Sequence, residues 1–241
     1  MRVSLFVTCL VDQLWPSVGT ATVAVLRQAG CEVTFDRRQT CCGQPAFNTG
    51  YRAEARSVAR HFVATMEQGD AQAIVIPSGS CAAMVQHIPE LFDATDPWRA
   101  RAQALAGRAH ELSAFLVREL GIVDLGARFD GRVTWHDACH GLRDLCIKDE
   151  PRRLIDRVAG AERVEVESSE SCCGFGGTFS VKYPEISVAM LDRKLEAIEA
   201  RQVDAVVSGD VSCLMQIGGR LQRKRSRVRT LHIAELLASR G

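Results

Sequence analysis

The sequence of 241 residues has no apolar run near the roughly 20 residues that a membrane-spanning helix needs. It also has no excess of either charge. Its 30 basic and 29 acidic residues leave a formal net charge of +1, which argues against a nucleic-acid partner. Asp12 soon follows the short apolar stretch 3–7, so we expect a first strand there and not a signal peptide. These absences favour a cytoplasmic protein without a transmembrane segment.

Two cofactor signatures are missing as well. Zinc modules usually place cysteines in pairs two to four residues apart, and this chain contains no C-x-x-C. Gly176 and Gly177 do not form the dinucleotide fingerprint G-x-G-x-x-G, because Phe179 stands where the third glycine would be. With no flavin or nicotinamide signature, the sequence leaves the catalytic residues, and any contact with substrate, undefined.

Cysteine, by contrast, is abundant, and eight of the ten cysteines repeat. The first quartet is Cys9, Cys41, Cys42 and Cys81, and the second is Cys139, Cys172, Cys173 and Cys213. Corresponding members are separated by 130, 131, 131 and 132 residues, which indicates an internal duplication. Cys31 and Cys146 have no counterparts, and we expect both to be structural.

Short β-prone segments alternate with helical segments in both halves, which favours parallel α/β units. We expect an α/β fold of two tandem, pseudo-symmetric domains with mainly parallel sheets, comprising residues 1–121 and 122–241. Expected strands are 3–7, 32–35, 73–76, 132–135, 163–166 and 204–207. Expected helices are 17–28, 51–66, 97–120, 150–158 and 184–201, with a further helix starting near Cys81 and with 229–237 forming a strand or a helix.

In this arrangement each cysteine motif follows the end of a strand. Carboxyl ends of parallel strands share one edge of the sheet, so the four thiols of each quartet should converge there. Adjacent cysteines have Cα atoms about 3.8 Å apart, too close for an unstrained disulfide within either Cys-Cys pair. The cysteines could bind zinc, hold an iron–sulfur cluster or serve as structural or redox thiols. An iron–sulfur cluster suits adjacent cysteines best, because a cluster is wide enough for neighbouring ligands to reach different iron atoms.

Three segments resemble the cysteine-rich CCG-domain family, found in one component of heterodisulfide reductase, in glycolate oxidase iron–sulfur subunits and, most similar, in the short lactate utilization A group. These segments are 41–48, 136–140 and 171–177. The resemblance implies an electron-transfer subunit of a cytoplasmic complex that oxidises L-lactate to pyruvate, non-autonomous as an enzyme. It further implies up to two [4Fe-4S] clusters held by the eight repeated cysteines. Two further lactate-utilization subunits would be its partners, at least one of them with Fe–S clusters.

The chain departs from this family at one position in each half. The CCG component of heterodisulfide reductase has a further cysteine at these positions, which helps to hold noncubane clusters, whereas this chain has Ser78 and Asp210. The two residues could act as oxygen ligands or as helix caps, and we prefer the helix caps. His136 and His140 flank Cys139, either facing a cluster or satisfied by backbone. The alternatives to the lactate interpretation are a heterodisulfide reductase-like or glycolate-oxidase-like redox subunit and, in another class, a zinc-stabilised scaffold without redox chemistry.

Overall fold

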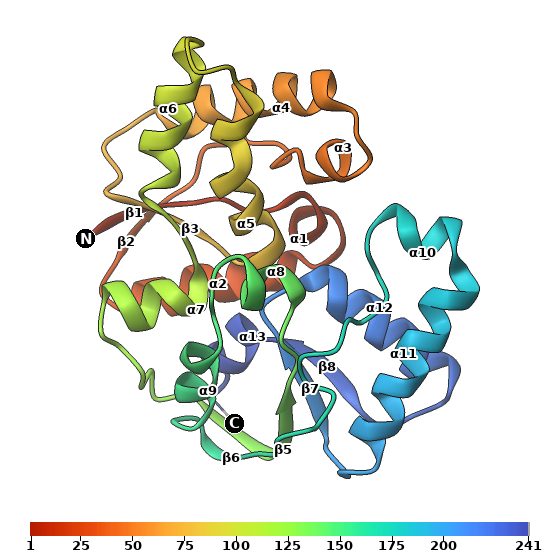
Figure 1. Ribbon diagram of the computed structural model, residues 1–241. Coiled ribbons are helices and arrows are strands. Elements are labelled where there is room, and N and C mark those ends of the chain that lie inside the picture. Colours follow the sequence, from red (N-terminus) through yellow and green to blue (C-terminus); the bar gives the residue numbers. More distant parts are fainter. Residues whose placement is uncertain (241) are drawn as a thin grey trace.

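The computed structural model describes residues 1–240 and contains two four-stranded parallel sheets (Figure 1). Their strand orders, β2-β1-β3-β4 and β6-β5-β7-β8, are the same pattern repeated, which confirms the predicted α/β fold of two tandem units. The strands are β1 Arg2–Leu5, β2 Glu32–Thr34, β3 Ala73–Ile76, β4 Ala109–Glu111, β5 Arg128–Trp135, β6 Ala159–Arg163, β7 Ala205–Ser208 and β8 Arg229–His232.

Helices connect the strands in the same order in both halves. The first half contains α1 Cys9–Leu14, α2 Pro16–Gln28, α3 Gln44–Asn48, α4 Arg52–Met66, α5 Gly79–His87, the 3-10 turn η1 Ile88–Leu91, α6 Pro97–Ala106, α7 Leu112–Ala114 and the π-turn η2 Phe115–Glu119. The second half contains α8 Cys139–Arg143, α9 Asp149–Ile155, α10 Thr178–Lys182, α11 Pro184–Glu199, α12 Val211–Arg223 and α13 Ile233–Ala238. Within residues 1–240, no helix combines the length and the apolar character that crossing a membrane requires.

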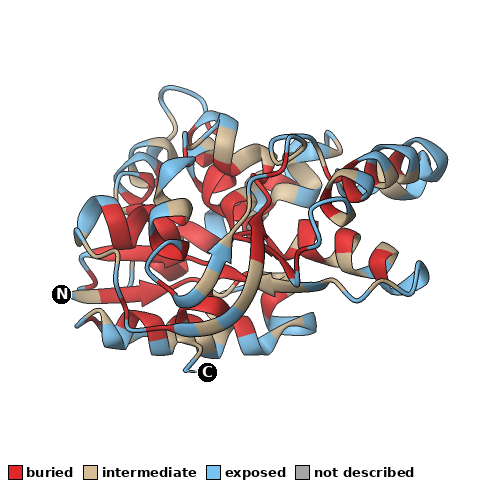
Figure 2. Cartoon of the chain, turned by 90° about the horizontal axis from the view of Figure 1, so that it is seen from below, coloured by how far each residue is buried: buried red, intermediate tan, exposed pale blue. Residues whose placement is uncertain are grey.

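One hydrophobic core contains residues of both halves, and each half has a further core of its own. Helix α2 buries Val18, Thr22, Val25 and Leu26 at helical spacing, and it packs against α13 of the other half. Helix α7 packs in turn against α9, so the last helix of each half contacts the opposite half, and α13 also packs on the strands of its own half (Figure 1). Buried strands lie inside and the exposed helix faces lie outside (Figure 2). The boundary at 121/122 falls between the sheets and stays a prediction.

Two expected elements are wrong. The expected helix 97–120 ends at Ala106, and Ala109–Glu111 instead pairs with β3 as strand β4. A strand of three residues is too short for alternation to reveal it, which is why this segment resembles a continuous helix. The strand expected at 163–166 forms earlier, as β6, and residues 229–237 form both a strand and a helix.

The two unpaired cysteines differ in environment. Cys31 is buried in the shared core, as expected for a small apolar side chain. Cys146 is exposed and has a left-handed backbone with φ of 52°, so its expected structural role in a core is wrong. The backbone carbonyl of Cys146 accepts a hydrogen bond of 2.8 Å from the Arg118 guanidinium.

Candidate metal-cluster sites

The first quartet gathers at the carboxyl edge of its sheet. Cys9 begins α1, with three residues between it and the end of β1, Cys41 and Cys42 lie between β2 and α3, and Cys81 lies in the first turn of α5 after β3. The sulfurs of Cys9 and Cys41 are 3.8 Å apart, and those of Cys42 and Cys81 are 3.3 Å apart. Four residues from three separate loops therefore meet where the topology predicts.

The second quartet repeats this arrangement. Cys139 begins α8 after β5, Cys172 and Cys173 precede α10, and Cys213 lies in the first turn of α12. The sulfurs of Cys173 and Cys213 and a ring nitrogen of His136 all lie within 4.8 Å of one another. The structure thus brings all eight repeated cysteines into two groups, and their role as ligands stays a prediction.

The glycine of each Cys-Cys-Gly turn shapes the site. Gly43 and Gly174 have φ of 90° and 83°, in the left-handed region that favours glycine. A Cβ on Gly174 would also lie 2.5 Å from the backbone oxygen of Ser187. The turn aims the glycine N–H at the first sulfur of the pair, at 3.4 Å for Cys41 and 3.3 Å for Cys172. Such N–H donors stabilise a thiolate or a cluster.

Ser78 and Asp210 act as helix caps, as we expected. The Ser78 hydroxyl accepts from the N–H of Cys81 at 3.3 Å, and one Asp210 oxygen accepts from the N–H of Ser212 at 3.2 Å. The other Asp210 oxygen accepts from the N–H of Ser80, across the junction of the halves, at 2.8 Å. One buried carboxylate therefore supports the amino ends of both helices that carry the last cysteine of a quartet.

Hydrogen bonding among the thiols favours one thiolate in each group. Donation from Cys42 and then Cys9 lowers the pKa of Cys41 to about 3. Donation from Cys139 and then Cys173 lowers the pKa of Cys172 to about 2. The pKa values of the thiols that donate these hydrogen bonds are raised in turn. Each group thus offers a preformed anionic sulfur to a cation.

His136 and His140 have different environments. His136 is 1% exposed, and neither ring nitrogen has a hydrogen-bond partner among the described residues. Burial, and then the charge of Lys194, lowers the pKa of His136 to about 3, against smaller opposing effects from Ser169 and Cys172. No partner of His136 within residues 1–240 meets hydrogen-bond geometry, although the backbone of Ser169 acts on its ring, so the choice between a cluster-facing and a backbone-satisfied His136 stays a prediction. His140 lies at the surface, with Nδ1 2.6 Å from a carboxylate oxygen of Asp144.

Lys194 is a residue of the second site that the sequence did not reveal. Its ammonium donates to the carbonyl oxygens of Ser168, of Ser169 at 3.2 Å and of Ser171 at 3.1 Å, in the loop that leads to Cys172. Burial lowers its pKa to about 8, and the sulfurs of the second quartet oppose that effect. The local pattern gave no signal, because Lys194 occupies an ordinary core position of α11.

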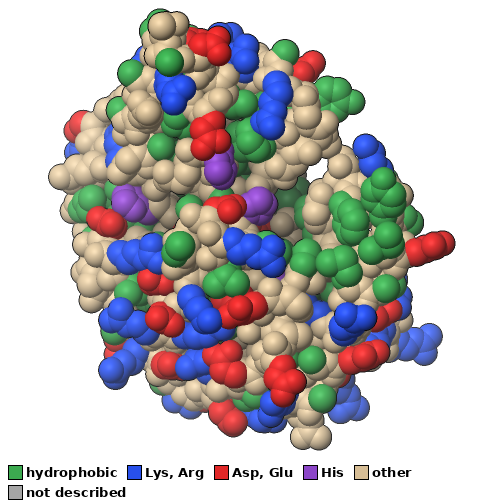
Figure 3. All heavy atoms as spheres, viewed as in Figure 1, with side chains coloured by type: hydrophobic (Ala, Val, Ile, Leu, Met, Phe, Trp, Pro, Cys, Tyr) green, Lys and Arg blue, Asp and Glu red, His purple; other side chains and the backbone are tan. Residues whose placement is uncertain are grey.

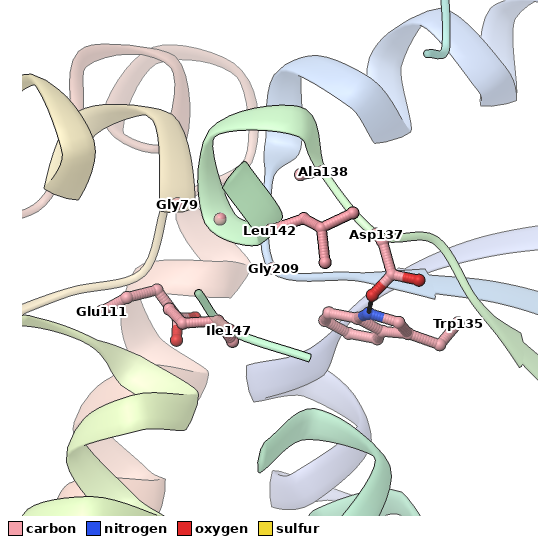
Figure 4. A pocket seen from close by; sticks show the side chains of 9 residues that line it. Gly79, Glu111, Trp135, Asp137, Ala138, Leu142, Ile147 and Gly209 are labelled. Atoms are coloured by element: carbon pink, nitrogen blue, oxygen red, sulfur yellow. Dashed lines mark hydrogen bonds between the residues drawn. The ribbon is translucent and has the colours of Figure 1, made fainter. Parts of the chain in front are cut away.

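A small cavity at the junction is lined by residues of both halves. Figure 4 shows Glu111 on one side of it, facing Trp135 and Asp137 on the other. The Trp135 indole donates to Asp137 at 2.8 Å, and Arg152 pairs with that carboxylate at 2.7 Å. Glu111 caps α7 by accepting two backbone N–H groups, and burial raises its pKa to about 7. These carboxylates are already engaged within the protein, so we assign them no metal.

Beside the second site, helices α10 and α11 expose a patch of large apolar side chains (Figure 3). Its members are Val181 at 79% exposure, Tyr183 at 55%, Ile186 at 54% and Met190 at 36%. Contiguous exposed apolar surface of this kind commonly marks an interaction site.

The spread of the thiols can be compared with the size of candidate groups. Four zinc–sulfur bonds of about 2.3 Å in a tetrahedron place all sulfur pairs about 3.8 Å apart. Among residues 1–240, the one set of three candidate ligand atoms within 4.8 Å of one another is His136 with Cys173 and Cys213. No three sulfurs of one quartet meet that spacing, although the pairs Cys42–Cys81 at 3.3 Å and Cys9–Cys41 at 3.8 Å are as close as two ligands of one zinc ion. Four cysteine thiolates suit either a metal ion or an iron–sulfur cluster, and the type of group stays a prediction.

Comparison with known proteins matches both halves to one family of cysteine-rich domains, designated CCG, over residues 3–86 and 133–218. The chain belongs to the CCG family. Each CCG match runs from the first strand of a half into the helix that carries the last cysteine, so it contains a complete quartet. Strands β4 and β8 and helices α7 and α13 lie outside both matches.

Relatives of this CCG protein align along nearly their whole length. Lactate utilization protein A of Exiguobacterium sp. is 48% identical and covers 98% of this chain and 96% of its own. The proteins of that name from Anoxybacillus flavithermus and Bacillus subtilis are 47% and 45% identical and cover 100% of both chains. Among solved structures, an aspartate racemase homologue from Pyrococcus horikoshii covers 98% of this chain and 95% of its own, with 7% identity and a TM-score of 0.35.

Proposed function

We propose that this protein is an iron–sulfur electron-transfer subunit of a complex that oxidises L-lactate to pyruvate. The observation that carries the proposal is the pair of four-cysteine groups, each assembled from three loops at the carboxyl edge of a parallel sheet. Cys9, Cys41, Cys42 and Cys81 would hold one [4Fe-4S] cluster, and Cys139, Cys172, Cys173 and Cys213 a second. When bound, each cluster would supply reversible one-electron transfer.

Two such centres match the electron count of the reaction. Converting L-lactate to pyruvate removes two electrons and two protons, and two one-electron centres hold that electron pair. This chain has no dinucleotide fingerprint, so the bonds of lactate would be broken on a partner subunit. The protein's own residues would bind the clusters, exclude water from them and adjust their potentials through hydrogen bonds and charge.

The relatives support the substrate and the partners. Proteins 44–48% identical to this chain carry the name lactate utilization protein A. The letter A in that name supports a lactate-utilization system of several proteins. The exposed apolar patch on α10 and α11 supports contact with one of two further subunits, at least one of which would carry Fe–S clusters. Ten free cysteines suit the reducing cytoplasm, where we place the protein.

The first experiment is metal analysis of protein purified without oxygen. We expect iron and sulfide in equal amounts, up to eight of each per chain, and visible absorbance that dithionite bleaches. Cys42→Ser and Cys173→Ser should each lose half the iron, whereas Cys31→Ser, a control on a core cysteine outside both quartets, should keep all of it. Zinc without iron or sulfide would instead establish the scaffold alternative and defeat the redox proposal.

The second experiment identifies the substrate. In the complex reconstituted with its partner subunits, L-lactate should reduce the clusters of this chain, whereas glycolate and a heterodisulfide couple should leave them unchanged. Reduction by glycolate alone, or oxidation by the heterodisulfide alone, would assign the protein to one of the alternative redox complexes.

A further inference from the structure

The internal duplication allows the two sites to be compared residue by residue. Strands β1 and β5 have the same register against β3 and β7. In that register the N–H of Phe6 donates to the carbonyl of Val75 at 3.0 Å, and the N–H of His136 donates to that of Val207 at 2.8 Å. Phe6 and His136 therefore occupy equivalent positions, three residues before the first cysteine of each quartet.

A second pair of equivalent positions lies on α4 and α11. The glycine that follows each Cys-Cys pair faces a backbone oxygen of the next long helix, that of Ala55 in the first half and of Ser187 in the second. Seven residues further along these helices stand Phe62 and Lys194. The same offset relates strand β3 to β7 and Cys81 to Cys213, so Phe62 and Lys194 correspond.

At these two positions the sites have opposite chemistry. Behind the first quartet, Phe6 and Phe62 form an edge-to-face pair with ring centroids 4.7 Å apart. Behind the second quartet, His136 and Lys194 are each 1% exposed, and the Lys194 charge acts on His136 and on the sulfurs of Cys173 and Cys213. A buried aromatic pair in one half is thus replaced by an imidazole and an ammonium in the other.

The unpartnered imidazole has a direct relation to the second site. A buried ring N–H without an acceptor costs free energy, and the sulfurs of Cys173 and Cys213 lie within 4.8 Å of a ring nitrogen of His136. A cluster bound there would provide sulfur acceptors for this N–H. The first site has no such donor at the equivalent position, because Phe6 has no polar side-chain atom.

From this asymmetry we propose that the second site has the higher reduction potential of the two, set by His136 and Lys194. The inference rests on the proposed function, since it requires clusters at both sites. Reduction adds negative charge to a cluster, and a hydrogen-bond donor or a cation near its sulfurs stabilises the reduced form. An apolar surround such as Phe6 and Phe62 gives no such stabilisation, so electrons collect at the second site.

Other charges near the sites do not reverse this order. The buried carboxylate of Asp137 lies near the second site, but it is paired with the guanidinium of Arg152. Arg143, exposed on α8, adds positive charge beside Cys139, where the first half has Gln13. Asp210 lies at the junction and caps the cluster-bearing helices of both halves.

The test is a redox titration of the cluster-loaded chain, followed by absorbance and electron paramagnetic resonance. The wild type should show two waves, and Cys42→Ser, which removes the first cluster, should retain the higher one. Lys194→Met should lower the reduction potential of the higher wave by at least about 59 mV. For one electron, this shift is a tenfold fall in the reduced-to-oxidised ratio at a fixed potential. His136→Phe, which copies the first half, should move the same wave in the same direction.

Lys182→Met is the matched control, because it removes one positive charge from an exposed position on α10 and should leave both waves unchanged. Iron content separates the possible failures. A chain that contains no iron after purification without oxygen would contradict both the proposed function and this inference. Chains with both clusters overturn the inference alone if Cys42→Ser retains the lower wave, or if neither substitution shifts the higher one. Loss of half the iron in His136→Phe would make His136 a ligand and overturn its role as a donor.

Discussion

Gly79 of α5 and Gly141 of α8 approach each other backbone to backbone at the junction of the halves. A Cβ built on Gly79 would lie 3.3 Å from both the Cα and the N of Gly141. Beside this contact, the N–H of Gly79 donates to the carbonyl of Gly209 at 3.2 Å. Because α5 carries Cys81 and α8 begins at Cys139, this contact fixes the distance between the two cysteine quartets.

Gly79→Ala should destabilise the protein by about 1 kcal/mol, because the new methyl group would lie 3.3 Å from the backbone of Gly141 in the other half, closer than ordinary van der Waals contact. Urea denaturation measures the change. Gly219→Ala is the control: it lies in helix α12 with nothing within 4 Å of the added Cβ, and alanine should stabilise the helix by about 0.5–1 kcal/mol. Equal effects of both substitutions would show that the helices do not pack this closely.

Asp210→Ala should lower the free energy of unfolding by about 2 kcal/mol, since it removes the cap of α12 and leaves the N–H of Ser80 in α5 without its acceptor. Asp210→Asn retains an oxygen acceptor and should lose less than half of that amount. Thermal unfolding of the metal-free chain measures both. If the alanine and asparagine variants are equally stable, the hydrogen bonds to Ser80 and Ser212 contribute nothing.

Glu111 predicts a specific pH dependence. Its folded pKa of about 7 lies above the ordinary 4.5, so between these values the folded chain binds more protons than the unfolded chain. This contribution to stability is complete below pH 4.5 and falls as pH rises through 7, by about 3 kcal/mol. Glu111→Gln should therefore be more stable than wild type at pH 8, and the advantage should disappear near pH 4.5.

Denaturation curves at several pH values test this prediction. Glu185→Gln is the control, since Glu185 is exposed on α11 and should give a profile parallel to that of the wild type. A Glu111→Gln profile that also runs parallel would mean that the buried carboxyl titrates normally.

Arg152→Met should destabilise the protein by about 3–5 kcal/mol, because it leaves the carboxylate of Asp137 buried without a counter-charge. Adding Asp137→Asn should restore part of the loss, since the amide removes the buried charge. Chemical denaturation of the two single variants and the double variant completes the cycle. Additive effects would contradict a direct interaction between the two side chains.

The sequence contains enough to place both sites but not to describe their surroundings. Cysteine spacing predicts the quartets because a duplicated ligand set keeps its position relative to the strands. Cysteine spacing cannot predict the role of Lys194, which lies between Leu191 and Leu195 on the buried face of α11. Nothing in the local sequence distinguishes this lysine from the other residues of the helix. Only the correspondence between the folded halves reveals that Phe62 is its counterpart. Strand β4 escapes for another reason, as three residues carry too little periodicity.

Helices α7 and α13 each lie against the opposite half of the molecule. A single half produced alone would therefore leave an apolar stripe uncovered and would have to find a second copy of itself. A pair of identical copies must carry identical metal centres, because any substitution appears in both. Joining the copies in one polypeptide removes that constraint and lets each centre change independently while the shared interior is kept.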